Sequence, residues 1–549
     1  MNRKVQPLDT PGTELTISVA GPKNYTAGAQ LVVHAREGNI RDVTILAGDL
    51  SDGQGNTIAA DNIVFFRQVY IDFKGVTAHG GTSPVPESSQ SGADGHIPDP
   101  LIPLVNPRSG GDLGQPFAVD SGQNQPVWVD INIPTTTTPG TYFGEITVLD
   151  GEHEVTVPVE VNVWDLVLPD MNVVTTHFRL ELNPLINYHR EIYDCNGNDC
   201  WLNWSDHARE VVRRYEELVH SHRIDGGQHM FYTPSDGCAP VTDWAEYDAA
   251  LTPYMDGSYF EDGVAASRIA VPFSPGVDWG IEADCTAAEY TQMAAAWAAH
   301  LKTKGWFERS VIYAYDEPPA EVLPLIAQHS DRIIAGDPDW KDHIMVTTAP
   351  DPDNIDILRD SVGIFCVAPA WYDRWGNPDR EAFGRSEWPA LMGEGISLWF
   401  YESNAQEAPY VSFATNTLDG AESTMMFWGS FYESATGFLY WSMSAWDEED
   451  PWGPATDWNK TGDGVLIYPG HHDGLMAPAG SPDGVEYDGP IPSYRLKMIR
   501  QGLADWALFI MAREAGLGTF AREQIHDAYR QLGGCEWQGC DPPLDEFFW

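Results

Sequence analysis

The sequence predicts a multidomain α/β protein in which an N-terminal β-sandwich precedes a TIM-like (β/α)8 barrel with helices at its C-terminal end. The chain has 549 residues, which is too many for one ordinary hydrophobic core. Its first part shows short alternating segments separated by turn residues, whereas strands alternate with helical patterns from Val173 onward. We therefore expect a sandwich domain at 1–168, a barrel at 169–490 and a helical segment at 491–549 that packs on the barrel.

The N-terminal part has the pattern of antiparallel strands. Residues 125–134 alternate apolar and polar side chains, and a turn leads into a second strand at 143–148, which predicts a hairpin. A last strand is expected at 155–163. The segment from about 75 to 125 is rich in Gly, Ser, Pro and Asp. This composition predicts an exposed loop that has the length to fold over the second domain.

The second part predicts eight strands with helices between them, which is the number that closes a barrel. Strands are expected at 173–180, 229–232, 268–273, 310–315, 344–348, 363–367, 396–401 and 437–441. Thr286 and Glu289 form a capping box at the start of the helix that precedes the fourth strand. Two further helices are expected at 493–514 and 519–532.

The fourth of these strands ends in two adjacent acids. The apolar run at 310–315 is followed by Asp316, Glu317 and two prolines. Because proline cannot extend a sheet ladder, both carboxylates are expected at the C-terminal tip of the strand. This end of a barrel carries the catalytic residues in (β/α)8 enzymes, and the backbone can turn where the strand ends, so that both side chains approach one ligand.

A pair of carboxylates suits glycoside cleavage, in which one acid protonates the leaving oxygen and another group stabilises the charge at the anomeric carbon. A helix N-cap or a calcium ligand is the alternative for an isolated Asp-Glu pair. Aromatic and acidic residues at other strand tips favour the first interpretation, although each ring alone is more typical of a core. These candidate substrate-binding residues are Trp371, Tyr372, Tyr401, Glu402, Trp441 and Trp446. His177 and Arg179, at the tip of the first strand, are candidates for sugar hydroxyls or for purely structural contacts.

Several motifs together resemble glycoside hydrolase family 123 and its wider relatives. They are Tyr315-Asp316-Glu317-Pro318, Leu398-Trp399-Phe400-Tyr401, Gly437-Phe438-Leu439-Tyr440-Trp441 with Asp450-Pro451-Trp452, and the segment 462–470 followed by Ser493-Tyr494-Arg495. Their order and spacing match across about 310–510, and the preceding sandwich is also similar. The resemblance implies a β-N-acetylgalactosaminidase that acts on a glycan with a terminal N-acetylhexosamine.

The resemblance also implies separate roles for the two acids. Glu317 is the expected general acid/base, and Asp316 is expected to orient the 2-acetamido nitrogen of the substrate. The acetamido oxygen then attacks the anomeric carbon and forms an oxazoline, so that configuration is retained without an enzyme nucleophile. Either Tyr372 or Tyr401 is expected to hold the acetamido oxygen.

Glu402 offers a rival mechanism, because it ends the seventh strand while Glu317 ends the fourth, as in barrel glycosidases with a protein nucleophile. Two alternatives for Glu402 are a residue that binds sugar hydroxyls and a solvated residue at the strand end without a role in catalysis. Of the three interpretations, we favour the solvated residue. Two other functions stay open. One is a glycosidase for GlcNAc or for a sugar without an acetamido group, and the other is a degenerate carbohydrate-binding protein. The intact acid pair argues against the degenerate protein.

Composition excludes some partners. The formal net charge of −50 repels nucleic acid and anionic membranes, and no stretch of about 18 apolar residues occurs in the chain. We expect no cofactor and no metal, since the Gly-Asp-Gly and Asp-Pro-Asp-Asn segments do not match a calcium loop of the EF-hand type.

The seven cysteines predict disulfides rather than a zinc site, because no further Cys or His lies nearby at a suitable spacing. The expected pairs are Cys195 with Cys200 and Cys535 with Cys540, both in loops, and a third bridge is possible between Cys238 and Cys285. Cys366 lies in an apolar strand and is expected to be a buried thiol. Disulfides indicate an oxidising compartment, so we expect a secreted or periplasmic protein whose signal peptide has been removed.

Overall fold

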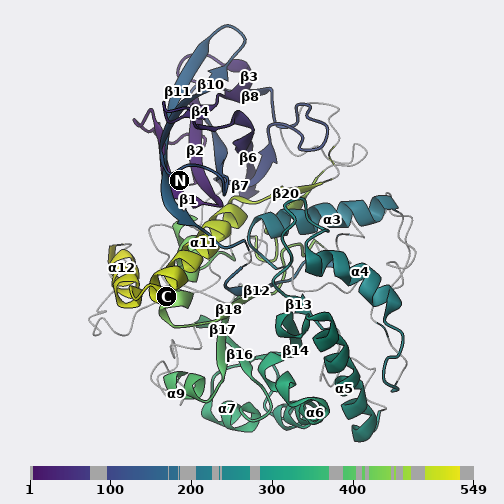
Figure 1. Cartoon of the computed structure of the whole chain (residues 1–549). Helices are drawn as coiled ribbons and strands as arrows, with labels where there is room; N and C mark the ends of the chain where they lie inside the picture. The colour runs from purple at the N-terminus through teal and green to yellow at the C-terminus, as the bar shows by residue number, and fades with distance from the viewer. Residues whose placement is uncertain are drawn as a thin grey trace.

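The structure is a computed structural model, and Figure 1 shows its arrangement. It describes residues 4–73, 95–170, 172–182, 206–225, 238–271, 285–369, 388–403, 411–414, 420–446, 462–470 and 489–531, together with Leu185, Pro234, Pro451, Trp452 and Tyr487. Within these ranges, no helix is long and apolar enough to cross a membrane.

The N-terminal part consists of two sheets that share one core. The first has the order β1 (Ile17–Lys23), β11 (Glu154–Val167), β10 (Gly140–Leu149), β3 (Ile40–Ala47) and β8 (Phe117–Val119). In addition, β4 (Leu50–Ser51) pairs with β10, and β5 (Thr57–Ile58) pairs with β4. The second has the order β2 (Tyr25–His34), β9 (Asn124–Ile133), β6 (Ile63–Phe73) and β7 (Gly95–Pro103). Every second side chain of β2 from Ala27 to Val33 is buried, as expected for a strand with one face on a core. Leu31 and Val129 of one sheet belong to the same cluster as Tyr142 and Val161 of the other.

Two predictions for this part are wrong. Strands β9 and β10 do not form a hairpin, because β9 pairs with β2 and β6 while β10 pairs with β11 and β3. The expected loop at 75–125 contains β7 and β8, although 74–94 lie outside the described residues. The prolines of β7 obscured it in the sequence. They are tolerated because β7 lies at the edge of its sheet, beside β6.

The second part is built on a sheet of seven parallel strands. Their order is β12 (Thr175–Phe178), β18 (Gly437–Tyr440), β17 (Ser397–Glu402), β16 (Ile364–Val367), β15 (Ile344–Thr347), β14 (Ser310–Asp316) and β13 (Ile269–Ala270). These strands confirm seven of the eight expected segments, and the eighth, at 229–232, lies outside the described residues. The first strand of the run, β12, pairs with the last, β18. All carboxyl ends therefore lie along one edge of the sheet.

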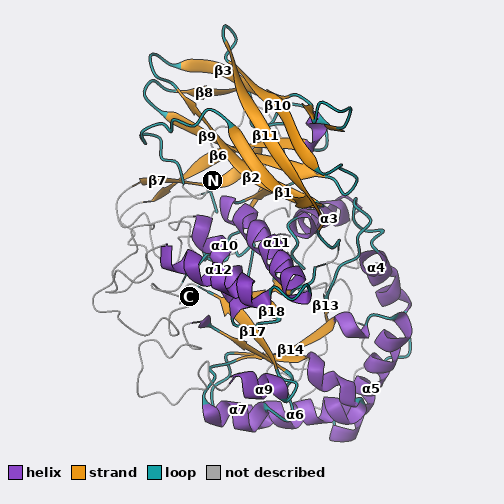
Figure 2. Ribbon diagram, turned by 60° about the vertical axis from the view of Figure 1, so that its left-hand side comes forward, coloured by secondary structure: helices purple, strands orange, loops and turns teal. Residues whose placement is uncertain are grey.

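Helices cover the outer face of this sheet, as Figure 2 shows for α5, α6, α7 and α9. Among the described residues, the α-helices of this part are α3 (Asp206–Ser221), α4 (Ala245–Asp256), α5 (Ala287–Lys304), α6 (Leu323–Gly336), α7 (Pro352–Leu358), α9 (Trp388–Gly393), α10 (Gly420–Tyr432), α11 (Tyr494–Glu514) and α12 (Gly518–Gln531). The predicted capping box of α5 is confirmed, since Thr286 and Glu289 exchange side-chain and backbone hydrogen bonds. Cys238 and Cys285 form a disulfide, and Cys366 is a buried free thiol. The other predicted cysteine pairs, Cys195–Cys200 and Cys535–Cys540, lie outside the described residues.

The inner face of the sheet has its own apolar cluster, which we call the inner cluster. Its members are Val311, Met345, Ile364, Cys366, Trp399, Tyr401 and Leu439, with Tyr313 and Ala368 packed against them. Trp399 fits because Gly437 lies opposite it on β18, where a Cβ would be only 2.2 Å from the indole ring. The guanidinium of Arg268 lies over the same ring, 5.5 Å from its centroid.

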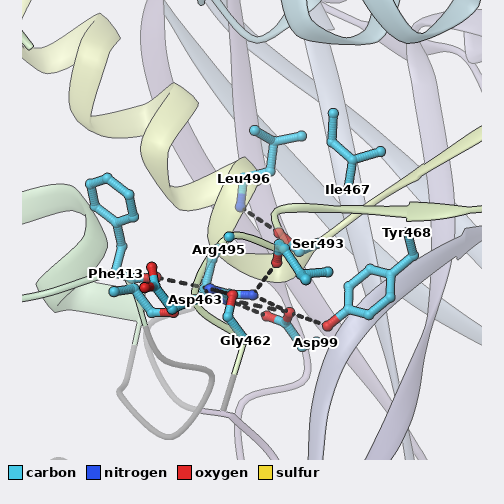
Figure 3. A network of polar contacts seen from close by, with 12 residues as sticks. Asp99, Phe413, Gly462, Asp463, Ile467, Tyr468, Ser493, Arg495 and Leu496 are labelled. Carbon is cyan, nitrogen blue, oxygen red and sulfur yellow. Dashed lines mark hydrogen bonds and ion pairs between the residues drawn. The ribbon is translucent and has the colours of Figure 1, made fainter. Parts of the chain in front are cut away.

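Helix α11 joins the two parts through buried charges. Arg495, in its first turn, forms an ion pair with Asp99 of β7 at 3.1 Å, and both side chains are at most 1% exposed. Figure 3 shows that the same guanidinium also meets the loops around Phe413 and Gly462. Further along α11, Lys497 and Arg500 bind Asp130 of β9. Burial by itself raises the pKa of Asp130, but the two cations overcome this effect and hold that pKa below its usual range.

The Arg495–Asp99 pair gives a stability prediction. Arg495→Met leaves Asp99 buried with the Tyr468 hydroxyl, which donates to Oδ2 at 2.7 Å, and with Lys4, whose Nζ is 3.8 Å away. It also removes the donor that the carbonyl groups of Phe413, Ala414 and Gly462 share. Breaking a buried pair in this way is expected to cost about 3–5 kcal/mol of unfolding free energy. Urea unfolding followed by circular dichroism measures the loss. Arg513→Met, an exposed position on the same helix, is the control, and equal midpoints for the two variants would contradict the prediction.

Candidate active site

The two adjacent acids lie at the carboxyl edge of the parallel sheet. Strand β14 ends at Asp316, and both Asp316 and Glu317 are exposed. This placement confirms that the acids stand at the strand tip. The hydroxyl of Tyr401, near the end of β17, donates a hydrogen bond to Glu317 Oε1 at 2.5 Å. The structure thus brings together three of the predicted site residues, from two strands of one sheet.

A β-bulge in β14 sets the direction of Asp316. Tyr313 pairs with Met345 of β15, whereas Tyr315 pairs with Val346, so that one residue is inserted in β14 relative to β15. The insertion changes the alternation of side chains along the strand. Tyr313 and Asp316, three residues apart, consequently face each other, and the Tyr313 hydroxyl donates to Asp316 Oδ1 at 2.8 Å.

The backbone of Glu317 turns sharply after the strand. Its φ of 47° lies in the left-handed region, which costs a residue other than glycine about 1–3 kcal/mol unless the surroundings enforce it. The Glu317 N–H donates to Thr347 Oγ1 at 2.9 Å and lies 3.2 Å from the Thr347 carbonyl oxygen. The end of β15 therefore holds this turn.

Thr347 contacts both acids. Its Oγ1 donates to Asp316 Oδ1 at 2.9 Å and lies 3.0 Å from the Tyr313 hydroxyl. Burial, followed by the nearby Asp316, raises the pKa of Tyr313 well above its ordinary value. Burial and the hydrogen bond to Glu317 likewise raise the pKa of Tyr401. Both phenols therefore keep their protons over the accessible pH range and act as donors to the carboxylates.

His177 lies beneath Tyr313 rather than at an open edge. It is 2% exposed, and its ring packs edge-to-face on Tyr313 with centroids 5.7 Å apart. The guanidinium of Arg268 hydrogen-bonds to His177 Nδ1. Because arginine only donates, Nδ1 accepts, and the ring proton is on Nε2. Burial, then Arg268 and Arg179, lower the pKa of His177 well below its ordinary value, so the ring is neutral.

The neighbouring Arg179 has a structural partner. Its side chain is 40% exposed, and Nε lies 3.1 Å from Oε1 of Glu181. Arg179 thus balances a neighbouring acid, which was one of the two roles expected from the sequence.

Glu402 faces away from the acid pair, and its expected solvation is wrong. Tyr401 belongs to the inner cluster, and the next residue on β17 points to the opposite, helix-covered face. Glu402 is 0% exposed, and its Oε1 accepts a hydrogen bond from Ser412 at 2.6 Å. Burial, with Asp463 and Glu422 nearby, raises its pKa well above the ordinary value. A neutral, buried carboxyl on this face does not fit a nucleophile that must reach sugar bound beside Glu317.

The predicted aromatic residues have different positions. Trp441 is 39% exposed just after β18, and its Nε1 donates to Asp463 Oδ1 at 3.0 Å. Trp446 is a core residue whose Nε1 donates to the carbonyl of Ile467. Trp371 and Tyr372 lie outside the described residues. Over the described part of the chain, no group of His, Cys, Asp and Glu side chains is arranged to hold a metal ion.

Sequence reasoning missed Tyr313, Thr347 and Arg268. Regular alternation in β14 places Tyr313 and Asp316 on opposite faces, and only the bulge brings them together. The sequence predicts Thr347 only as part of the strand at 344–348. The sequence feature that points to Thr347 is its position at the carboxyl end of the strand that follows the acid pair, where polar residues often face the ligand.

Comparisons with known proteins identify the family. Residues 3–150 match the glycoside hydrolase 123 N-terminal domain, and residues 281–512 match the glycoside hydrolase 123 catalytic domain. No curated protein sequence matches the chain significantly.

One solved structure shows the same relationship for the fold. A family 123 glycoside hydrolase from Clostridium perfringens is 18% identical, with 93% of this chain and 87% of that chain covered and a TM-score of 0.66. A β-glucuronidase from Parabacteroides merdae is 10% identical, covers 79% of this chain and 51% of its own, and has a TM-score of 0.24. β-Glucuronidase 3 from Bacteroides uniformis is 8% identical, with 77% and 50% covered and a TM-score of 0.23. Only the first likeness is strong enough to show a common fold.

The buried Glu402 gives a pH prediction. Because its pKa is raised in the folded protein, the folded state keeps this proton as pH rises above 4.5, where the unfolded chain loses it. The contribution of Glu402 to the free energy of unfolding is therefore largest at low pH, and it declines as the pH rises. Glu402→Gln is isosteric and removes the decline. Urea unfolding at pH 5 and pH 8 is expected to show a smaller loss of unfolding free energy for the variant than for the wild type. The same pH dependence in both proteins would contradict a buried, neutral Glu402.

Proposed function

Since this chain belongs to glycoside hydrolase family 123, we propose that it is a retaining exo-β-N-acetylgalactosaminidase that works by substrate-assisted catalysis. The observation that carries the proposal is the separate anchoring of two consecutive carboxylates. Asp316 is held by Tyr313 and Thr347, and Glu317 is held by Tyr401. Two acids held apart in this way suit two different tasks.

In the proposed mechanism, Asp316 receives the acetamido N–H of the substrate. Both hydroxyl groups that hold Asp316 bind the same oxygen, Oδ1, which leaves Oδ2 to accept from the substrate. A carboxylate at this N–H increases the electron density on the acetamido oxygen as it attacks the anomeric carbon. The bond to the leaving group breaks, and the sugar becomes an oxazolinium ion that Asp316 stabilises.

Glu317 moves the protons. It donates a proton to the departing oxygen in the first step, and it takes a proton from water in the second step, when water opens the oxazoline with net retention. Tyr401 donates to Glu317 Oε1 and so fixes the direction of this carboxyl group. The burial of Glu402 on the opposite face of β17 supports this mechanism over one with a protein nucleophile.

We also propose the finer architecture that the strand order supports. Strand β12 beside β18 is the arrangement of a closed (β/α)8 barrel, with the second strand at 229–232. The two N-terminal sheets around one core support a β-sandwich. The disulfide between Cys238 and Cys285 supports secretion or a periplasmic location.

Matched amide substitutions test the proposal. Glu317→Gln is expected to lower kcat on aryl β-GalNAc by about 10²–10⁴-fold, because proton transfer at the leaving oxygen is lost. Glu402→Gln, the same change on the other face, is expected to stay close to the wild type. Asp316→Asn is expected to lower kcat on acetamido sugars by a similar factor. Steady-state kinetics on aryl β-GalNAc, β-GlcNAc, β-galactoside and β-glucoside measure these effects and rank the sugars.

A thiazoline analogue of the oxazoline is expected to inhibit strongly, since it resembles the intermediate. A glycosyl adduct trapped on Glu402, or equal turnover of β-galactoside and β-GalNAc, would contradict substrate assistance. Glycan binding without turnover of any of the four sugars would indicate a binding protein instead.

A further inference from the structure

We propose that Tyr313 and Thr347 are positioning residues that fix the orientation of Asp316 and, through Thr347, the turn that aims Glu317. The inference rests on the proposed function and adds to it the residues that make the acid pair rigid. Asp316 is exposed at the end of a strand, where a short side chain is otherwise free to rotate. Its two partners lie within the sheet and are far less exposed, with Thr347 at 0%.

The three oxygen atoms form a closed triangle. Asp316 Oδ1 lies 2.8 Å from the Tyr313 hydroxyl and 2.9 Å from Thr347 Oγ1, and the two hydroxyl groups are 3.0 Å apart. Each hydroxyl has one proton, and each proton can go to the carboxylate. Two donors on a single oxygen fix both the position and the rotation of the carboxyl plane.

Thr347 has a second task that Tyr313 lacks. After donating its proton to Asp316, Oγ1 still has lone pairs, and it accepts the backbone N–H of Glu317 at 2.9 Å. This hydrogen bond secures the left-handed backbone of Glu317. One hydroxyl group therefore sets the orientation of one acid and the direction of the other.

Buried residues of the inner face of the sheet support Tyr313 in turn. Its ring meets the His177 ring edge-to-face, and Arg268 secures His177 by a hydrogen bond to Nδ1 while Nη1 donates to the Thr176 carbonyl at 2.7 Å. Arg268 is 2% exposed and lies over Trp399. The support for Asp316 thus continues from the strand tip into the interior of the sheet.

Nearly isosteric substitutions that remove one hydroxyl group at a time test the proposal. Tyr313→Phe and Thr347→Val are each expected to lower kcat on aryl β-GalNAc about 10- to 100-fold, with KM changed less than about threefold, because misplacement of a reacting group acts on the chemical step. Thr347→Ser keeps the hydroxyl and is expected to restore kcat to within about threefold of the wild type. In the Asp316→Asn background, Tyr313→Phe is expected to cause no further loss.

Thr348→Val is the matched control. Thr348 follows Thr347 in the chain and is 2% exposed, but its hydroxyl accepts from Asn354 Nδ2 at 3.3 Å and donates to the Ala349 carbonyl at 3.4 Å rather than to Asp316. It is expected to keep the wild-type kcat, and thermal unfolding checks that all variants are folded. Losses no larger than that of the control, or losses that multiply with Asp316→Asn, would overturn the positioning role while the proposed function stands.

Crystal structures of Tyr313→Phe and Thr347→Val give a readout that does not need turnover. If the wild type hydrolyses none of the four glycosides, the proposed function fails, and these structures decide the positioning role. The Asp316 carboxyl group is expected to rotate in both variants, and Glu317 is expected to leave the left-handed region in Thr347→Val alone. An unchanged Asp316 in both structures would overturn the proposal.

Discussion

The buried guanidinium of Arg495 is the interaction on which the arrangement of this molecule depends. It pairs with Asp99 and donates to the carbonyl groups of Phe413, Ala414, Gly462 and Val465. A buried arginine is costly unless its donors are satisfied, so the segments that supply these acceptors must assemble around it together. They come from an edge strand of the N-terminal part and from the loops after β17 and β18. The N-terminal part is therefore a structural component of the edge where the acids lie.

The acidic residues on the two faces of the parallel sheet lie in different environments. At the inner rim, Asp316 and Glu317 stay exposed and receive hydroxyl donors from Tyr313, Thr347 and Tyr401. On the helix-covered face, Glu402 is buried, and burial keeps it protonated. Strand position alone does not distinguish the two environments, because Glu317 and Glu402 both lie at the carboxyl ends of parallel strands in the same sheet. The side on which the strand exposes each residue decides which acid can meet a substrate.

Local sequence signals predicted what depends on nearby residues, including the acid pair after an apolar strand, the capping box of α5 and the run of parallel strands. The errors have long-range causes. Strand β7 contains three prolines and resembles a loop, yet it carries Asp99, whose partner is 396 residues away in sequence. The predicted hairpin of β9 and β10 is wrong because the alternation of apolar and polar residues shows which side chains are buried, but not which sheet a strand joins. The Tyr313–Asp316 contact depends on a bulge that regular alternation cannot predict.

Residues of three strands are needed to hold the acid pair in the geometry of the candidate active site. A left-handed Glu317 is unfavourable by itself, and such strain persists only where the surroundings enforce it. Here the bulge in β14 redirects Asp316, the end of β15 accepts the Glu317 N–H, and Tyr401 of β17 binds the Glu317 side chain. The same Asp-Glu-Pro sequence at another strand end would lack Thr347 and Tyr401 and would relax to ordinary backbone angles. Specificity for a reaction therefore lies in the positions of hydroxyl groups 30 and 84 residues beyond Glu317 in sequence, more than in the two acids themselves.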